Sequence, residues 1–193
     1  MPRKSTQDKV EGVAIRLFAK NGYQSTSTRK IAEEAGVSEL TIYRCYKTKL
    51  DLFRQAFLKQ SPDRWLKTIE PDPAKTTEEQ LLYLCETLYK TLIEREDLIR
   101  IFYQDADQCQ EILKAGREVP KKILVPIANY LQKVCPILPE ATARVLAIQV
   151  FTAYLGRFLL TSSMGEEILP YSIKIFHREM VETYALRIKD ACK

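Results

Sequence analysis

The chain has 193 residues, which is enough for a small domain followed by a larger one with a core that needs no disulfide or metal. Hydrophobic residues make up 46% and glycine occurs only six times, a composition that favours a helical protein over a loop-rich or all-β one. The formal net charge of +5 is uneven, because residues 1–60 carry twelve Lys and Arg against six Asp and Glu. This basic excess favours an anionic partner such as nucleic acid, although a solvated charged face would give the same count.

The first 60 residues contain four short segments with helical periodicity. Apolar residues line one face of residues 8–20, and Asn21-Gly22 is typical of a helix end. Further helices are predicted at 28–35, at 39–46 and after Thr48.

The remaining residues predict five more helices and no strand, so we expect an all-α protein of about nine helices. The predicted ranges are 76–94, 97–105, 119–134, 139–162 and 170–191. Pro62 is expected to end or kink the fourth helix, Pro120 to lie in the first turn of its helix, and Pro126 to kink that helix.

The cysteines, the N-terminus and the apolar segments exclude several classes of protein. The five cysteines are odd in number and contain no CxxC pair, which indicates a reduced, cytoplasmic protein without a disulfide framework or a metal site. No apolar stretch near the N-terminus suggests a secretory signal. The most apolar segment, 145–160, is interrupted by Gln149 and Arg157 and falls short of a membrane span. We therefore expect no cofactor and no membrane partner.

Two short helices with a tight glycine turn between them have the layout of a helix-turn-helix. Ala32 and Ala35 are small enough for the helices to approach closely, and Gly36 permits the sharp turn. Ser38 caps the second helix, and Ile42 fixes its crossing angle. The outward face of this recognition helix can then enter the major groove of DNA.

The segment from Gly22 to Phe53 resembles the DNA-binding signature of the TetR family of bacterial transcriptional regulators. The matching elements are the Thr-rich entry at 25–28, Ile-Ala-x-x-Ala-Gly-Val-Ser at 31–38, Thr-Ile-Tyr-Arg at 41–44, and Lys49. The resemblance covers residues 8–57. It fits a three-helix, helix-turn-helix DNA-binding domain at 1–50 and a larger helical effector-binding and dimerisation domain at 51–193.

Eleven residues are expected at the interface with double-stranded DNA. The resemblance implies that Thr28, Tyr43 and Lys49 contact the phosphate backbone. It also implies that five side chains lie near base edges, namely Arg29, Glu39, Leu40, Thr41 and Arg44. The full set is Thr28, Arg29, Ser38, Glu39, Leu40, Thr41, Tyr43, Arg44, Tyr46, Lys47 and Lys49. Glu39 has an alternative role, because an acidic residue in a first turn also complements the helix dipole. DNA contact is favoured for Arg29 and Arg44, and the alternative is that they are ordinary surface arginines.

Two positions depart from the family pattern, so the operator preference of relatives does not transfer. Leu40 stands where the family often has glycine, and Cys45 stands where an aromatic residue is common. Leu40 either contacts a thymine methyl group or packs inside the small domain. Cys45 is either a small packing residue or a redox switch beside DNA.

Residues 144–162 are apolar on nearly every side, so a soluble helix here must be covered all round. A second subunit is the natural cover, with the last helix as neighbour, and the resemblance implies the same four-helix bundle. The expected interface is Ala153, Gly156, Phe158, Phe176, Met180 and Tyr184. The alternative is a wholly intramolecular core. A two-fold dimer would bind a palindromic operator with recognition helices roughly 34–36 Å apart.

The resemblance also implies a small-molecule effector among the middle helices. Candidate lining residues, each of which can instead be plain core, are Leu84, Leu88, Phe102, Tyr103, Ile127, Phe151 and Tyr154. Their apolar character favours a hydrophobic effector.

The sequence is therefore interpreted as a cytoplasmic, nucleoid-associated homodimeric regulator, a repressor rather than an activator, that the effector releases from DNA. One rival is a DNA-bound module whose larger domain recognises a protein. The other is an enzyme or carrier with a vestigial DNA-binding fold, which we do not expect because His177 is the only histidine and no GxSxG or Gly-rich phosphate loop occurs.

Overall fold

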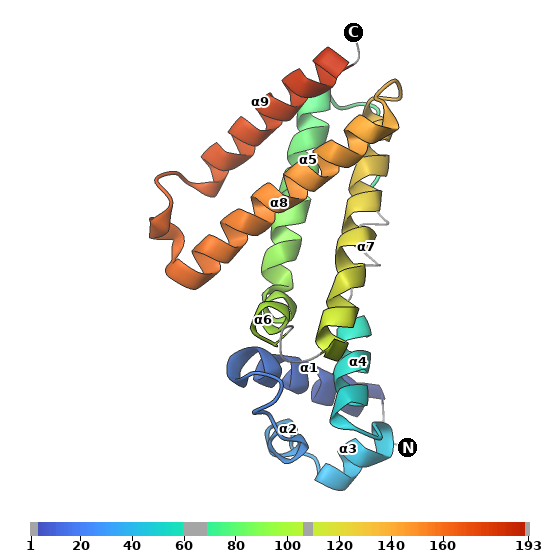
Figure 1. Ribbon diagram of the computed structural model, residues 1–193, viewed down its shortest axis with the longest axis vertical. Coiled ribbons are helices and arrows are strands. Elements are labelled where there is room, and N and C mark those ends of the chain that lie inside the picture. The colour runs from blue at the N-terminus through green and yellow to red at the C-terminus, as the bar shows by residue number, and fades with distance from the viewer. Residues whose placement is uncertain (1–3, 60–68, 106–109, 192–193) are drawn as a thin grey trace. The chain divides into compact units, whose positions relative to one another are not determined.

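The computed structural model describes residues 4–59, 69–105 and 110–191, and these form nine α-helices, one short 3-10 helix and no strand (Figure 1). The helices are α1 Lys4–Asn21, α2 Thr28–Ala35, α3 Glu39–Cys45, α4 Lys49–Lys59, α5 Thr77–Glu94, α6 Glu96–Asp105, α7 Gln110–Val134, α8 Glu140–Met164, η3 Glu166–Ile168 and α9 Ile173–Ala191. The all-α prediction is confirmed.

The chain divides into two compact units that interleave along the sequence. Unit 1 comprises residues 1–61 and 95–119, and unit 2 comprises residues 62–94 and 120–193. This division differs from the predicted boundary at residue 50, because α4 packs on α1 and buries Leu52 and Phe53 in the core of unit 1.

Helix α7 contributes to both units and is longer than the sequence predicts. It begins at Gln110, well before the expected start at residue 119, and continues through Pro120 and Pro126. Proline lacks an N–H but its φ angle is compatible with a helix, so each proline removes one hydrogen bond without ending α7. The change of unit falls at Pro120. The bend expected at Pro62 lies outside the described residues.

The core of unit 1 is built on α1. The face predicted from periodicity is buried at every position, namely Val10, Val13, Ala14, Leu17 and Phe18. The rings of Phe18, Tyr23 and Phe53 contact one another with centroids 5.2 to 5.9 Å apart. Leu98 and Ile101 of α6 complete this core, so a helix remote in sequence helps to support α2 and α3.

A polar network that is buried at Tyr46 and Glu11 and exposed at Lys59 joins α1, α4 and the end of α3. The Tyr46 hydroxyl is 2.8 Å from Oε1 of Glu11 and donates to it, and the Lys59 ammonium lies 2.8 Å from Oε2 of the same carboxylate. Lys59 also contacts Asp8. Burial and the neighbouring Glu11 carboxylate raise the pKa of Tyr46, so its hydroxyl stays a donor at neutral pH.

Unit 2 is organised around α5, which packs against α8 and α9. Leu84 and Leu88 of α5 are fully buried there. Tyr154 of α8 and His177 of α9 form a buried hydrogen bond of 2.6 Å between the hydroxyl oxygen and Nδ1. Burial lowers the pKa of His177, so the ring is neutral near pH 7.

Helix α8 is long and apolar enough to cross a membrane by length and composition alone. However, Leu146, Val150 and Phe158 are buried inside unit 2 and α8 packs against α5, η3 and α9. The core helix of a soluble protein has the same composition, and we interpret α8 as such a helix.

Replacing Tyr46 with phenylalanine should destabilise unit 1. The Tyr46→Phe variant removes the donor to the buried Glu11 carboxylate, and we expect the free energy of unfolding to fall by about 2 kcal/mol in urea titrations. Tyr43→Phe is the control, because Tyr43 is half exposed and its loss should cost less than about 1 kcal/mol. Equal losses in the two variants would contradict the network's role.

Acidification should weaken unit 2 through His177. The folded-state pKa is depressed below the unfolded value of about 6.5, so between these values the unfolded chain binds more protons and stability falls as the pH falls. The slope from this single group is at most about 1.4 kcal/mol per pH unit. Unfolding curves at pH 7.5 and 5.0 should show a larger acid loss for the wild type than for His177→Gln, and identical losses would exclude His177 as the cause.

Candidate nucleic-acid interface

The helix-turn-helix is fixed by three short-range devices. The Ser27 hydroxyl caps α2 by accepting from the Lys30 amide at 3.1 Å, and the Ser38 hydroxyl caps α3 by accepting from the Thr41 amide at 3.2 Å. Between them Gly36 adopts a left-handed conformation, with φ 66° and ψ 37°, which a residue with a side chain rarely takes. The predicted turn is confirmed at Gly36 and Ser38.

Packing decides which face of α3 points outward. Ile31, Ala32 and Ala35 of α2 and Ile42 of α3 are buried in unit 1. On the opposite side of α3 the exposed side chains are Leu40, Tyr43 and Arg44. Leu40 is 60% exposed, so the alternative in which it packs inside the domain is wrong.

Three residues of the predicted interface contact one another directly. The Thr28 hydroxyl donates to Oε1 of Glu39 at 2.7 Å and lies 3.2 Å from the Tyr43 hydroxyl. Thr28 begins α2, whereas Glu39 and Tyr43 lie one turn apart on α3, so this cluster spans both helices. Nearby, Ser38 and Thr41 share a hydroxyl contact of 2.9 Å.

Arg29 and Lys47 occupy the solvent-exposed surface of the motif. Nε of Arg29 donates to Glu33 at 3.0 Å, and both side chains are mostly exposed. Such an i, i+4 pair on a surface is weak, so the guanidinium remains available to a stronger anion.

Two residues of the predicted interface have roles inside unit 1. Tyr46 is 1% exposed and gives its hydroxyl proton to Glu11, so the structure does not support its place at the DNA interface. The Lys49 ammonium donates to the carbonyls of Tyr23 and Thr26 at 3.0 and 3.2 Å and lies over the Tyr23 ring. In this conformation Lys49 stabilises the loop before α2.

The same loop is held by a residue that sequence reasoning missed. The carboxylate of Asp105, at the end of α6, accepts from the Tyr23 amide at 2.9 Å and is buried. Gly22 beside it has φ 82°, and an added Cβ would lie 3.4 Å from Oδ1 of Asp105. The bond joins positions 82 residues apart, and no local sequence signal indicates it.

The predicted effector residues fall into both units. Leu84, Leu88, Ile127, Phe151 and Tyr154 are buried in unit 2. In contrast, Phe102 packs against the core of unit 1, and Tyr103 beside it is 56% exposed. Phe102 and Tyr103 are therefore not part of the unit 2 core that the other five share.

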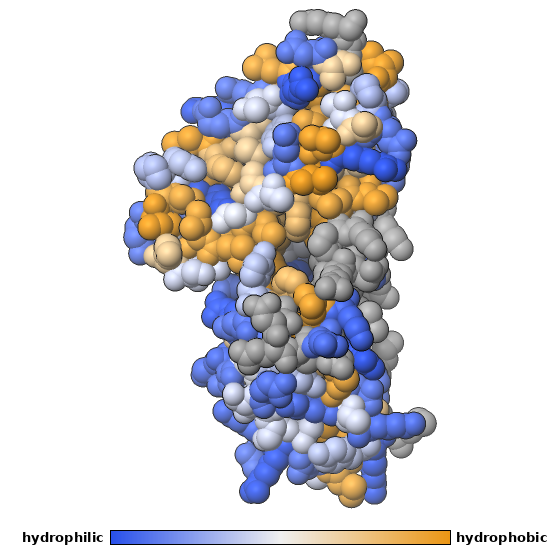
Figure 2. Space-filling model, viewed as in Figure 1, coloured by the Kyte–Doolittle hydropathy of each residue, from blue (hydrophilic) through white to orange (hydrophobic). Residues whose placement is uncertain are grey.

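The predicted dimer residues are also of two kinds. Phe158 and Tyr184 are buried within unit 2 itself, so they are core residues and not a surface for a partner. Ala153, Gly156, Phe176 and Met180 are half-buried. The exposed apolar side chains of α8 and α9 are Val145, Ile148, Leu160, Met164, Ile175 and Leu186. Figure 2 shows apolar surface gathered over this part of unit 2.

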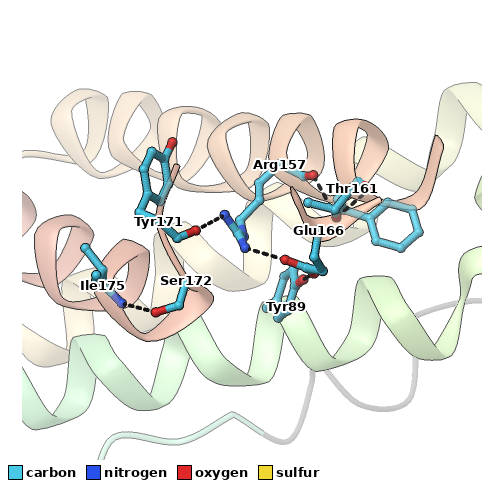
Figure 3. Close-up of polar contacts among 8 residues, drawn as sticks. Tyr89, Arg157, Thr161, Glu166, Tyr171, Ser172 and Ile175 are labelled. Carbon is cyan, nitrogen blue, oxygen red and sulfur yellow. Dashed lines mark hydrogen bonds and ion pairs between the residues drawn. The ribbon is translucent and has the colours of Figure 1, made fainter. Parts of the chain in front are cut away.

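Arg157, which interrupts the apolar segment 145–160, is buried at the α8–α9 connection, a role that no sequence pattern indicated (Figure 3). Its Nη2 donates to Oε2 of Glu166 at 2.8 Å, and Nη1 is 3.5 Å from the Tyr171 carbonyl oxygen. The Tyr89 hydroxyl reaches the same Glu166 carboxylate from α5. These contacts fix the connection between α8 and α9.

Known proteins share both the motif and the fold. The family described as bacterial regulatory proteins, tetR family, matches residues 12–56. The helix-turn-helix transcriptional regulator YvkB of Bacillus subtilis is 30% identical over 131 residues, which is 67% of each chain. A fatty acid metabolism regulator protein of the same organism is 29% identical over 128 residues, 66% of this chain and 63% of its own.

A solved structure extends the likeness to nearly the whole chain. The transcriptional regulator FadR from Bacillus subtilis, in complex with stearoyl-CoA, has a TM-score of 0.66 and 20% sequence identity over 90% of this chain and 95% of its own. Together with the capped helix-turn-helix, the matches identify a DNA-binding protein of transcription regulation. The chain belongs to the TetR family of bacterial regulatory proteins.

Proposed function

We propose that this protein is a ligand-responsive repressor that binds a palindromic operator as a homodimer and is released by a small hydrophobic effector. The observation that carries the proposal is the outward face of α3, where Leu40, Tyr43 and Arg44 are exposed while the opposite side is locked into unit 1. An exposed recognition helix with a rigid base is what major-groove reading requires.

The exposed side chains divide into two roles at the DNA. Arg29, Thr41 and Arg44 approach base edges, and Leu40 offers an apolar contact to a thymine methyl group. Ser38 and Lys47, with the hydroxyls of Thr28 and Tyr43, supply donors to phosphates that set the register of the protein. The excess of twelve Lys and Arg over six acidic residues in the first 60 positions supports this electrostatic role.

Homodimer formation is assigned to the exposed face of α8 with α9 beside it. Gly156 lies in the middle of α8, where a glycine costs about 0.5–1 kcal/mol relative to alanine. A Cβ added at Gly156 would meet no atom within 4 Å among the described residues, so their packing does not require the glycine. Close approach of a partner helix supplies the reason for it, and Val145 and Ile148 extend the apolar surface along α8.

The effector is placed in the apolar core where α5 meets α8. Leu84, Leu88 and Phe151 supply apolar walls there, and Tyr154 adds a polar group. The relative solved with stearoyl-CoA, a ligand with a long acyl chain, supports a hydrophobic effector for this chain. Release requires that the effector bind the DNA-free conformation more tightly than the DNA-bound one.

Truncating Arg44 tests the proposed recognition. With a duplex selected by the wild type from random sequences, Arg44→Ala should weaken binding by about 1–3 kcal/mol and relax preference at one base position. Binding by fluorescence anisotropy, with repeated selection by the variant, measures both effects. An equal loss of affinity on every sequence would show that Arg44 contacts the DNA backbone and not a base. A wild type that selects no sequence would refute operator binding.

Filling the space at Gly156 tests the dimer. Gly156→Leu should weaken self-association by at least tenfold, about 1.4 kcal/mol, because the added side chain separates the paired helices. Gly12→Leu is the matched control, since Gly12 is also helical and open to solvent. Sedimentation velocity at micromolar concentration measures the self-association of both variants and of the wild type. A monomeric wild type would exclude the dimer, and an undisturbed Gly156→Leu dimer would exclude this face.

A further inference from the structure

The three-residue cluster Thr28–Glu39–Tyr43 has a fixed direction of proton donation. A threonine hydroxyl has one proton, and Thr28 gives it to Oε1 of Glu39 across 2.7 Å. The 3.2 Å contact between Thr28 and Tyr43 must then run from the Tyr43 hydroxyl to the Thr28 oxygen. Both hydroxyl protons are therefore directed along one chain that ends on the Glu39 carboxylate.

This arrangement occupies two donors that the proposed function assigns to DNA phosphate. A carboxylate and a phosphate are both anionic acceptors of hydroxyl protons, so they compete for Thr28 and Tyr43. Both anions cannot bind the same hydroxyl pair, because their charges would repel each other at hydrogen-bond distance. A phosphate that reaches Thr28 must therefore displace Glu39.

Each base pair offers the displaced Glu39 one amino donor in the major groove, on one of its two strands, so pairing depends on which base lies beside the carboxylate. A carboxylate only accepts hydrogen bonds, and in the major groove only the amino groups of cytosine and adenine donate them. Guanine and thymine present acceptors at the equivalent positions, beside which Glu39 would remain unpaired and repelled by the phosphates.

We propose that the Glu39 carboxylate occupies, in the DNA-free protein, the place that a DNA phosphate takes at Thr28 and Tyr43. The phosphate can bind these two hydroxyls only when a base with an amino group lies beside α3 and accepts Glu39 as its partner. Glu39 then determines specificity mainly by penalising wrong sequences. On non-specific DNA the carboxylate stays on Thr28 and excludes the phosphate, whereas on the operator it moves to the base and both contacts form. The inference rests on the proposed operator binding and adds a role for one acidic residue within it.

The test compares Glu39→Gln with Glu34→Gln in the full-length protein. Both variants remove one negative charge from the helix-turn-helix, and Glu34 is an exposed residue of α2. The probes are a random-sequence duplex and the duplex that the wild type selects, at two salt concentrations. Glu39→Gln should bind the random duplex about tenfold more tightly and the selected duplex less than threefold more tightly, so the specificity ratio falls. Its salt dependence on the random duplex should become steeper.

A double-mutant cycle with Thr28→Val assigns the effect to the observed contact. Without the Thr28 hydroxyl, the gain from Glu39→Gln on random DNA should largely disappear. Glu39→Ala should also bind the random duplex more tightly than the wild type does. This control shows that the gain comes from loss of the carboxylate and not from contacts of the new glutamine amide.

Each other outcome overturns the inference. Equal gains in affinity for the random duplex in Glu39→Gln and Glu34→Gln would show that the effect comes only from the change in net charge. Weaker binding of Glu39→Gln to both duplexes would show that Glu39 simply contacts DNA. Unchanged binding to both duplexes would show that Glu39 has no role in DNA binding. If the wild type binds neither duplex, the operator proposal itself fails, which is a different result from a wild type that binds and a variant that does not gain.

Discussion

The left-handed turn at Gly36 determines the direction in which α3 leaves α2, and the interface depends on that direction. With φ at 66°, the chain reverses just after the buried Ala35 and brings Ser38 to the start of α3. Ile42 then fixes the helix by a single buried side chain, which leaves most of this short helix exposed. A helix of this length has little stability of its own, so its position is set by the turn, the cap and the core beneath it.

That core draws on a part of the chain that a boundary at residue 50 would assign to another domain. Leu98 and Ile101 of α6 pack into unit 1, and Asp105 holds the Tyr23 amide in the loop that precedes α2. Only Arg95 separates the end of α5 in unit 2 from the start of α6 in unit 1. A change in α5 therefore has a covalent route to the loop before α2. Coupling of this kind needs two arrangements of the same packed element, and α6 is the element of unit 1 that follows α5 directly in sequence.

Sequence patterns predicted the elements whose causes are local. The periodic face of α1, the glycine turn and the serine caps each depend on residues within one or two helical turns, and the structure has them as predicted. The long-range pairings could not be predicted in the same way. Tyr46 meets Glu11 across 35 positions and Tyr23 meets Asp105 across 82, and neither pair has a local signal.

The predictions that differ from the structure share a physical cause. The sequence pattern is the same whether the polar end of an aromatic residue beside a DNA-binding motif faces phosphate or the core, and Tyr46 directs its hydroxyl to Glu11 inside unit 1. The same ambiguity placed Phe158 and Tyr184 on a partner surface, although both are buried in their own unit. Side-chain direction, which depends on tertiary packing, decided these cases.

Several of the polar groups that we assign to DNA have partners within the protein itself. Thr28 and Tyr43 point to Glu39, Arg29 pairs with Glu33, and Ser38 contacts Thr41. Binding is therefore an exchange of internal partners for phosphates and bases, and its net free energy is smaller than the number of contacts formed suggests. Where the internal partner is a carboxylate that must be displaced, as at Glu39, the exchange is also selective, because the released carboxylate needs an amino donor, which each base pair offers on only one of its two strands. An acidic residue in an otherwise basic motif can thus lower affinity in general and raise the difference between one sequence and the rest.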